Sequence, residues 1–344
     1  MASDEIVNVW DDNLEVEFDK IMGLIDKYNY VSMDTEFPGI CVTGDNITGY
    51  PFIKGNVDKL RLIQVGICLA NENGEMPQPV GTWQFNLKFN LDEDEHSKDS
   101  IILLKDAGID FEQLNLRGIH ELRFAELLIS SGLILNEDIN WVTFHGAFDF
   151  GYLLKSLTNM SLPSSLERFY KSLKDFFPSV YDLKILVNEV PELKNGSLTK
   201  LGQDLDVKRS GIQHQAGSDA YLTSQCFFKI KSTFMKSGIP KKTFNRIYGL
   251  QQEYQQAYNP STPAANYSTY IEKPQTLPGQ QTTNYAPNMM YQTPPAYTYY
   301  PNVPNVDVHA AYYFNHFDPN NMNIFNQTTP AGMMNMQGAY RFGK

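Results

Sequence analysis

The sequence has few cysteines, no long apolar segment and too little positive charge to balance its acids. Its three cysteines, Cys41, Cys68 and Cys226, are too few for a disulfide framework and lack metal-ligand spacing, which favours a reducing compartment. No apolar run reaches the length of a membrane span, and residues 1–5 lack the basic start of a signal peptide. We therefore expect a soluble protein of the cytoplasm or nucleus, with no membrane partner.

The charge balance limits how the protein could hold nucleic acid. The chain has 39 Asp and Glu against 28 Lys and Arg, a net charge of −11. This disfavours a broad electrostatic grip on a phosphate backbone. A nuclease whose bound metal ions supply local positive charge is still allowed. The charged residues after Tyr254 sum to zero, so the acidic excess belongs to the first 254 residues.

The composition changes near Gln255. Residues 255–344 are rich in Asn, Gln, Pro, Tyr, Thr and Met and poor in Leu, Ile and Val. Such a segment cannot bury a core, so we expect a disordered tail after a folded domain at residues 1–254. A tail that folds onto a partner is the alternative.

Strand and helix patterns alternate before the tail. The predicted strands cover residues 30–36, 60–69, 82–87 and 141–145. The predicted helices cover residues 14–28, 98–106, 119–131, 164–176, 197–205 and 218–235, with another from about 148 and a short element at 181–187. Three early strands followed by mixed strands and helices indicate an α/β domain with a mixed sheet flanked by helices.

Asp34 and Glu36 end the first predicted strand, with one residue between them. Because side chains alternate along a strand, the two acids point the same way, about 7 Å apart. Carboxylates on one face repel each other unless a cation lies between them, and a hard divalent ion prefers oxygen ligands. The alternative is an acidic pair that is only solvated.

Three further residues could join this pair. Asp149 lies where a predicted strand gives way to a helix, so it could instead be a helix N-cap. Asp219 and His214 are five positions apart, about 140° on a continuous helix, so they would not share a helix face. With Gly217 between them, His214 is better placed on the approaching loop and Asp219 in the first turns of the helix. The alternative for His214 is polar surface.

Four acids and one histidine suit a two-metal phosphodiester hydrolase. Two divalent ions clamp the scissile phosphate and activate water, and a histidine near its ordinary pKa can accept the proton. Asp182 is an acid outside this set, and we expect it to be structural.

Six motifs occur in order along the folded part of the chain. They are SMDTEFPG at 32–39, TWQFN at 82–86, FDFGY at 148–152, FFPSVYD at 176–182, HQAGSD at 214–219 and YGL at 248–250. Together they resemble the Caf/Pop deadenylases, the ribonuclease-H-like DEDD exonucleases of the Ccr–Not complex. The similarity runs from about Val9 to Leu250. Residues 144–148 depart from the usual Phe-His-Ser-Gly-Tyr, a change that touches no carboxylate. The tail lies outside the resemblance.

The resemblance implies a poly(A)-specific 3′→5′ exoribonuclease that shortens mRNA tails and releases 5′-AMP, in mRNA decay and translational repression. It implies that Asp34, Glu36, Asp149 and Asp219 bind two Mg²⁺ or Mn²⁺ ions and that His214 is the general base. The implied partners are poly(A) RNA, a Not-type scaffold and a leucine-rich-repeat deadenylase subunit. The implied location is the cytoplasm, including P-bodies, and the nucleus.

One residue and two rival functions complete the expectations. Phe37, next to the acids, is hypothesised to pack near the terminal nucleotide, with a core phenylalanine as the alternative. The first rival function is a related DEDD exonuclease acting on other RNA or on DNA. The second is a non-catalytic adaptor that bridges members of the complex and regulates transcription.

Overall fold

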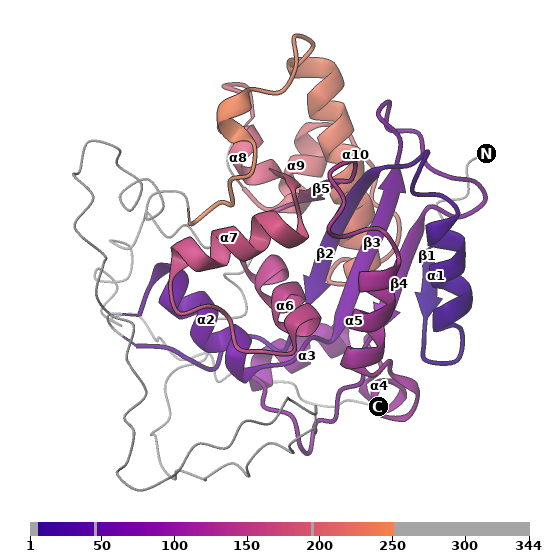
Figure 1. Cartoon of the computed structure of the whole chain (residues 1–344), viewed down its shortest axis with the longest axis vertical. Helices are drawn as coiled ribbons and strands as arrows, with labels where there is room; N and C mark the ends of the chain where they lie inside the picture. The colour runs from indigo at the N-terminus through magenta and orange to yellow at the C-terminus, as the bar shows by residue number, and fades with distance from the viewer. Residues whose placement is uncertain (1–5, 45–46, 194–195, 251–344) are drawn as a thin grey trace, which may run out of the picture. The chain divides into compact units, whose positions relative to one another are not determined.

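The computed structural model describes residues 6–44, 47–193 and 196–250 (Figure 1). The predicted tail at 255–344 and its boundary with the folded domain lie outside these residues. Within them, no helix is both long enough and apolar enough to cross a membrane.

A six-stranded mixed sheet forms the centre of the described part (Figure 1). Its strands, in sheet order, are β1 (Ile6–Val9), β4 (Thr82–Asn86), β3 (Gln64–Ala70), β2 (Tyr30–Glu36), β5 (Asn140–Thr143) and β6 (Ser179–Asp182). Strands β4, β3 and β2 pair antiparallel, whereas β1 is parallel to β4, and β5 is parallel to both β2 and β6. The expected mixed α/β sheet is confirmed.

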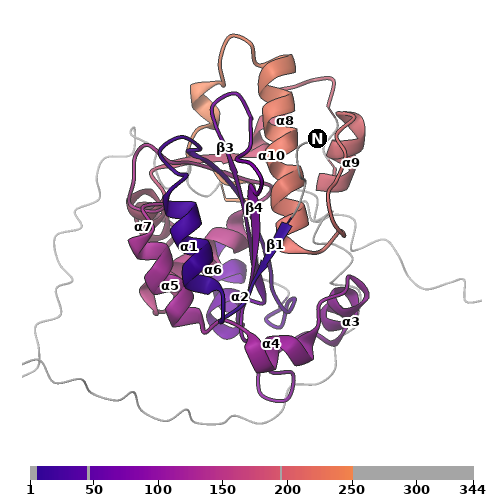
Figure 2. The ribbon, with the colours of Figure 1, turned by 90° about the vertical axis from the view of Figure 1, so that its right-hand side faces the viewer.

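Helices cover both faces of this sheet (Figure 2). One face carries α1 (Leu14–Met22), α2 (Gly49–Lys59), α5 (Glu121–Ser130), α6 (Ala147–Thr158) and α7 (Leu166–Phe176). The other face carries α8 (Leu183–Val187), α9 (Leu198–Asp204) and α10 (Ala216–Phe234). Helices α3 (Lys98–Asp106) and α4 (Phe111–Arg117) lie at one end of the sheet, and a 3-10 turn spans Lys241–Thr243.

Each face of the sheet has its own apolar core. Trp141 and Phe150 lie in the core under α6, and Leu222 and Phe227 lie in the core under α10. Every residue of β3 is buried, because both faces of this strand are covered. This explains why its sequence is mostly apolar and lacks the alternation of a half-exposed strand.

The largest errors of the sequence prediction are three elements that it omitted. Strand β1 and helices α2 and α4 were not predicted. Helix α2 contains Gly49, Pro51 and Gly55, residues that weaken a helical pattern, although proline is tolerated in a first turn. The helix predicted at 14–28 ends at Met22, the strand predicted at 60–69 begins at Gln64, and the element predicted at 181–187 is the end of β6 followed by α8.

Candidate active site

Strand β2 places its two acids near the middle of the sheet. Asp34 pairs with Gly66 of β3, and directly opposed residues project from the same face of a sheet. A Cβ atom added to Gly66 would lie 1.9 Å from the Ala216 carbonyl oxygen at the start of α10. Asp34 therefore faces α10, as does Glu36 two residues later. The expectation that the two acids share a face is confirmed.

The same close approach explains why a glycine interrupts the apolar strand β3. Any side chain at Gly66 would push α10 away from the sheet, because it would meet the helix backbone rather than a movable side chain. Gly217 in the first turn of α10 also allows the helix to approach the sheet closely, since a Cβ there would lie 2.7 Å from the Ile6 side chain. These two glycines allow the first turn of α10, and with it Asp219, to lie against the acidic strand.

Asp149 reaches the same region from α6, on the opposite face of the sheet. It lies in the first turn of the helix and is buried, with 7% of its surface exposed. The hydroxyl Oγ1 of Thr35 donates to its Oδ1 at 2.7 Å. The N-cap position belongs to Gly146, so the alternative interpretation of Asp149 as a helix cap is wrong. Thr35, between the two strand acids, was not predicted to take part.

Asp219 and His214 meet at the start of α10. Asp219 lies in the first turn of the helix, and His214 lies on the loop before it with a left-handed φ of 64°. In this conformation the His214 backbone N–H donates to Asp219 Oδ2 at 3.0 Å. The amide nitrogen of Gln213 lies 3.2 Å from His214 Nε2. Because an amide NH₂ group only donates, this contact makes Nε2 the unprotonated ring nitrogen.

The five predicted residues converge. Ligand atoms of Glu36, His214 and Asp219 all lie within 4.8 Å of one another. Asp34 is close enough to Asp219 and Asp149 for each of these charges to act on its carboxyl group. Asp34 and Glu36 keep part of their surface open to solvent.

The acids repel one another, as their pKa values indicate. Burial, followed by the charges of Asp219 and Asp149, raises the pKa of both Asp34 and Glu36 well above the ordinary range. Burial raises the pKa of Asp149 to about 7, although the hydrogen bond from Thr35 acts to lower it. Burial lowers the pKa of His214, and the charge of Asp219 opposes that shift. Burial thus favours the neutral form of the His214 imidazole, which is the form that can accept a proton.

This donor set fits divalent cations. Four carboxylates supply hard oxygen ligands, and a cation among them would relieve the repulsion that raises their pKa values. Ligand atoms of two of these acids, Glu36 and Asp219, lie within 4.8 Å of each other and of a ring nitrogen of His214. Mg²⁺ and Mn²⁺ both prefer such oxygen-rich sites.

Arg209, which was not predicted, lies against this cluster. It belongs to the segment between α9 and α10, and its guanidinium Nη1 donates to Asp219 Oδ1 at 2.5 Å. Its positive charge opposes the upward pKa shifts of Asp34 and Glu36. A single arginine in a loop carries no sequence signal for such a contact.

Phe37 lies in an aromatic cluster beside the acids. Its ring stacks on Phe148 with 5.2 Å between ring centroids, and it contacts Tyr152 with 5.0 Å between centroids. Phe52 meets Phe148 edge to face at 6.0 Å. Phe37, Phe52 and Phe148 are all partly exposed. Phe37 therefore packs on the core, as the alternative interpretation held, and still presents part of its surface next to Glu36.

Asp182 has a different environment from the site acids. Its carboxylate is fully buried and accepts four backbone N–H groups. Oδ1 accepts from His145 and Lys184, both at 2.9 Å, and Oδ2 accepts from Tyr248 at 3.0 Å and Gly146 at 3.3 Å. This agrees with the structural part predicted for it.

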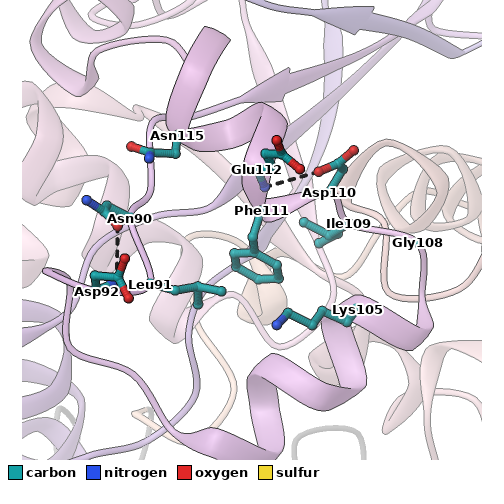
Figure 3. A pocket seen from close by; sticks show the side chains of 10 residues that line it. All are labelled: Asn90, Leu91, Asp92, Lys105, Gly108, Ile109, Asp110, Phe111, Glu112 and Asn115. Atoms are coloured by element: carbon teal, nitrogen blue, oxygen red, sulfur yellow. Dashed lines mark hydrogen bonds between the residues drawn. The ribbon is translucent and has the colours of Figure 1, made fainter.

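A cavity of about 650 Å³ lies away from the five predicted residues (Figure 3). It is lined by the segment after β4, the end of α3 and the start of α4. Asp92, Asp110 and Glu112 contribute acidic side chains there, against the single cation Lys105. None of the predicted site residues lines it, and its charge does not suit a phosphate.

Comparison with known proteins agrees with the motifs. Residues 9–127 and 129–227 match the CAF1 family ribonuclease. The poly(A) ribonuclease pop2 of Schizosaccharomyces pombe is 44% identical over 251 residues, which are 71% of this chain and 75% of that protein.

Two solved structures are also similar. S. pombe Pop2p in its Mg²⁺- and Mn²⁺-bound form matches at 45% identity with a TM-score of 0.68, covering 71% of this chain and 99% of that one. The structure of the yeast NOT1 MIF4G domain co-crystallized with CAF1 contains a chain that matches at 32% identity with a TM-score of 0.63, covering 71% of this chain and 96% of that one. The resemblance and the expected ribonuclease-H-like fold are confirmed.

Proposed function

The chain belongs to the CAF1 family of ribonucleases, and from this premise we propose that it is a poly(A)-specific 3′→5′ exoribonuclease that shortens mRNA tails and releases 5′-AMP. One observation carries the proposal. Four carboxylates and a neutral histidine gather in a chain that is 44% identical to a poly(A) ribonuclease.

The carboxylates of Asp34, Glu36, Asp149 and Asp219 would hold two divalent ions, Mg²⁺ or Mn²⁺. When bound, such ions supply positive charge at the scissile phosphate and lower the pKa of the attacking water. The chain prepares the acids for this in two ways. The Thr35 hydroxyl orients Asp149, and the His214 N–H orients Asp219.

His214 would be the general base. Its Nε2 is the unprotonated ring nitrogen, and the burial that lowers its pKa favours the neutral imidazole. The ring can therefore accept the proton of the attacking water. General-base catalysis of this kind is typically worth about 10²–10⁴-fold.

Phe37 and Phe148 would carry the terminal base. Two partly exposed rings that stack next to Glu36 offer a base an apolar face beside the acids. A base stacked on an aromatic side chain typically gains about 1–3 kcal/mol. Replacing Phe37 by leucine should raise KM for poly(A) about fivefold with little change in kcat, as steady-state kinetics can measure. Phe244→Leu, on an exposed ring that contacts Tyr181, is the control.

The protein would act within the Ccr–Not complex. Support for a Not-type scaffold comes from the yeast NOT1 MIF4G domain co-crystallized with CAF1. We propose a leucine-rich-repeat deadenylase subunit as a further partner on the family resemblance alone. The same resemblance supports the proposed location in the cytoplasm, including P-bodies, and in the nucleus.

The decisive experiment uses a 5′-labelled RNA with a mixed-sequence body and an A-tail. Wild-type protein with Mg²⁺ or Mn²⁺ should produce a ladder that stops at the body and should release 5′-AMP. Digestion that continues through the body would instead favour a DEDD exonuclease of broader specificity. A truncated chain that lacks residues 255–344 should give the same ladder.

The adaptor alternative predicts a different outcome. If purified wild-type protein leaves poly(A) intact across a titration of both metals, and Asp34→Ala changes nothing, the chain is a non-catalytic subunit. The same titration determines which metal supports the faster reaction.

A further inference from the structure

Arg209 is held on three sides by two helices. Besides its bond to Asp219 Oδ1, Nη1 donates to Ser218 Oγ at 3.1 Å, and Nη2 donates to Thr199 Oγ1 of α9 at 3.2 Å. The Ser218 hydroxyl donates in turn to the Ser210 carbonyl at 2.6 Å, which leaves its lone pairs for the arginine. Only 16% of the Arg209 side chain is exposed. A guanidinium with this many fixed partners is anchored and is not a mobile surface charge.

The Asp219 carboxylate, which Arg209 binds, also accepts a hydrogen bond from the loop that contains His214. Oδ1 of Asp219 accepts from the arginine, and Oδ2 accepts the backbone N–H of His214. His214 adopts a left-handed conformation that is rare for a residue with a side chain. One carboxylate thus connects Arg209 to the loop that presents the imidazole, and each oxygen keeps a lone pair for a metal ion.

We propose that Arg209 is a positioning residue, whose guanidinium fixes the Asp219 carboxylate, and through it the His214 main chain, in the orientation that faces Glu36. This deepens the proposed function and rests on it. The hydrogen bonds that the guanidinium donates to Thr199 and Ser218 fix its orientation, and the guanidinium in turn fixes the orientation of the Asp219 carboxylate. Groups that orient metal ligands in this way are commonly worth about 10–100-fold in metal affinity.

Positioning and simple charge compensation predict opposite effects. If Arg209 only neutralised the acids, it would compete with a cation for Asp219, and its removal would make metal binding tighter. If it positions Asp219, its removal should make metal binding weaker, although a positive charge has been taken away. The sign of the change in affinity therefore decides between the two.

The test measures Mn²⁺ binding by titration calorimetry on the full chain, first stripped of metal with a chelator. Arg209→Ala should bind Mn²⁺ about 10–100-fold more weakly than wild type. Arg209→Lys keeps the charge but cannot bond Thr199 and Asp219 together, so it should also bind more weakly. Tighter or unchanged binding in Arg209→Ala, or wild-type binding in Arg209→Lys, would overturn the proposal.

A milder variant protects the test against misfolding. Thr199→Val keeps the shape and the arginine but removes one hydrogen bond, so Mn²⁺ binding should weaken about two- to tenfold. Unchanged binding in Thr199→Val would contradict the three-point anchor. Arg168→Ala, on the exposed surface of α7, is the matched control and should bind as wild type does.

Kinetics add a second readout. Arg209→Ala at saturating Mn²⁺ should lower kcat and leave KM for poly(A) within about twofold, because the residue orients the site and does not bind RNA. A raised KM with unchanged kcat would mean that Arg209 binds phosphate, and the proposal would fall. The Mn²⁺ titration needs no RNA, so it tests the positioning role of Arg209 separately from activity. A wild-type protein that binds Mn²⁺ but does not cleave poly(A) would refute the proposed function and leave the result for Arg209 to the titration.

Discussion

Two turns of this protein contain the same local arrangement, a histidine with a left-handed φ whose backbone N–H donates to an aspartate carboxylate. The groups that surround the two turns differ. At the start of α6, His145 has a left-handed φ of 67°, and its N–H donates to Asp182 at 2.9 Å. Before α10, His214 has a φ of 64°, and its N–H donates to Asp219 at 3.0 Å. Each turn leads into a helix that carries a site acid in its first turn.

The partners of the two carboxylates differ. Asp182 accepts four backbone N–H groups and is fully buried. Asp219 accepts one backbone N–H and a guanidinium, and its charge raises the pKa of Asp34 and Glu36. A buried carboxylate surrounded by N–H donors is already satisfied, whereas one facing other acids has a use for a cation.

The two imidazoles differ in the same way. Burial lowers the pKa of His145 to about 3, and its ring packs edge to face on Tyr248. The ring of His214 lies within reach of Glu36. Identical backbone geometry therefore serves structure in one turn, and in the other it suits the chemistry that we propose.

Removing Asp219 should have the largest effect on activity. Asp219→Ala should lower kcat for poly(A) by about 10³-fold or more, because a ligand of the proposed metal site and the anchor of His214 are lost together. Steady-state assays in Mn²⁺ measure this, with Asp175→Ala on the exposed side of α7 as control. A variant that retained a tenth of wild-type activity would contradict the proposed site.

Removing Asp182 should have the largest effect on stability. Asp182→Ala leaves four buried N–H groups without their acceptor, and each such group costs about 1–3 kcal/mol. The free energy of unfolding should therefore fall by at least about 3 kcal/mol. Urea unfolding in chelator measures the change. If activity vanished while stability stayed the same, Asp182 would belong to the active site and the contrast between the two turns would fail.

Replacing each of the two histidines should affect different properties, kcat for His214 and stability for His145. His214→Ala should lower kcat about 10²-fold or more with little loss of stability, because only the proton acceptor is removed. His145→Ala should lower the melting temperature and leave the kcat of the folded protein within a few-fold of wild type. Thermal unfolding and kinetics on both variants provide the comparison, and equal effects on kcat would refute it.

The pH dependence of stability should show the cost of burying the charged form of Asp149. The folded pKa of Asp149 is about 7 against an ordinary value of 3.8, so its contribution to stability is present below pH 3.8 and lost as the pH rises towards 7. In chelator, Asp149→Asn should therefore be more stable than wild type at pH 8, by about 4 kcal/mol, and close to it near pH 4.

The difference in the free energy of unfolding between Asp149→Asn and wild type isolates the contribution of Asp149 from that of His145. His145 contributes the opposite slope, because its folded pKa lies below 6.5 and its contribution is lost as the pH falls below that value. Both proteins contain His145, so its contribution cancels in the difference. Saturating Mn²⁺ should reverse the order at pH 8. An Asp149→Asn protein that is less stable than wild type in chelator at pH 8 would contradict the raised pKa of this acid.

The sequence alone determined which residues could form the site. Asp34 and Glu36 follow from strand alternation, and Asp219 with His214 from the glycine between them, because both arguments use only neighbouring residues. The mixed sheet also follows from local patterns. The short elements β1 and α4 were missed because few residues give too little local signal, and the longer helix α2 was missed because of its glycines and proline.

Tertiary structure decided what each residue contacts. Thr35 is 114 positions from Asp149, and Gly66 lies under the helix backbone at Ala216, so neither contact leaves a trace in local sequence. Asp182 differs from Asp219 only through the segments that pack around each. Arg209 is similar, because a loop arginine acquires its partners when α9 and α10 come together. Local sequence fixes the chemistry that is available, and packing between distant segments decides which groups are satisfied and which require a cation.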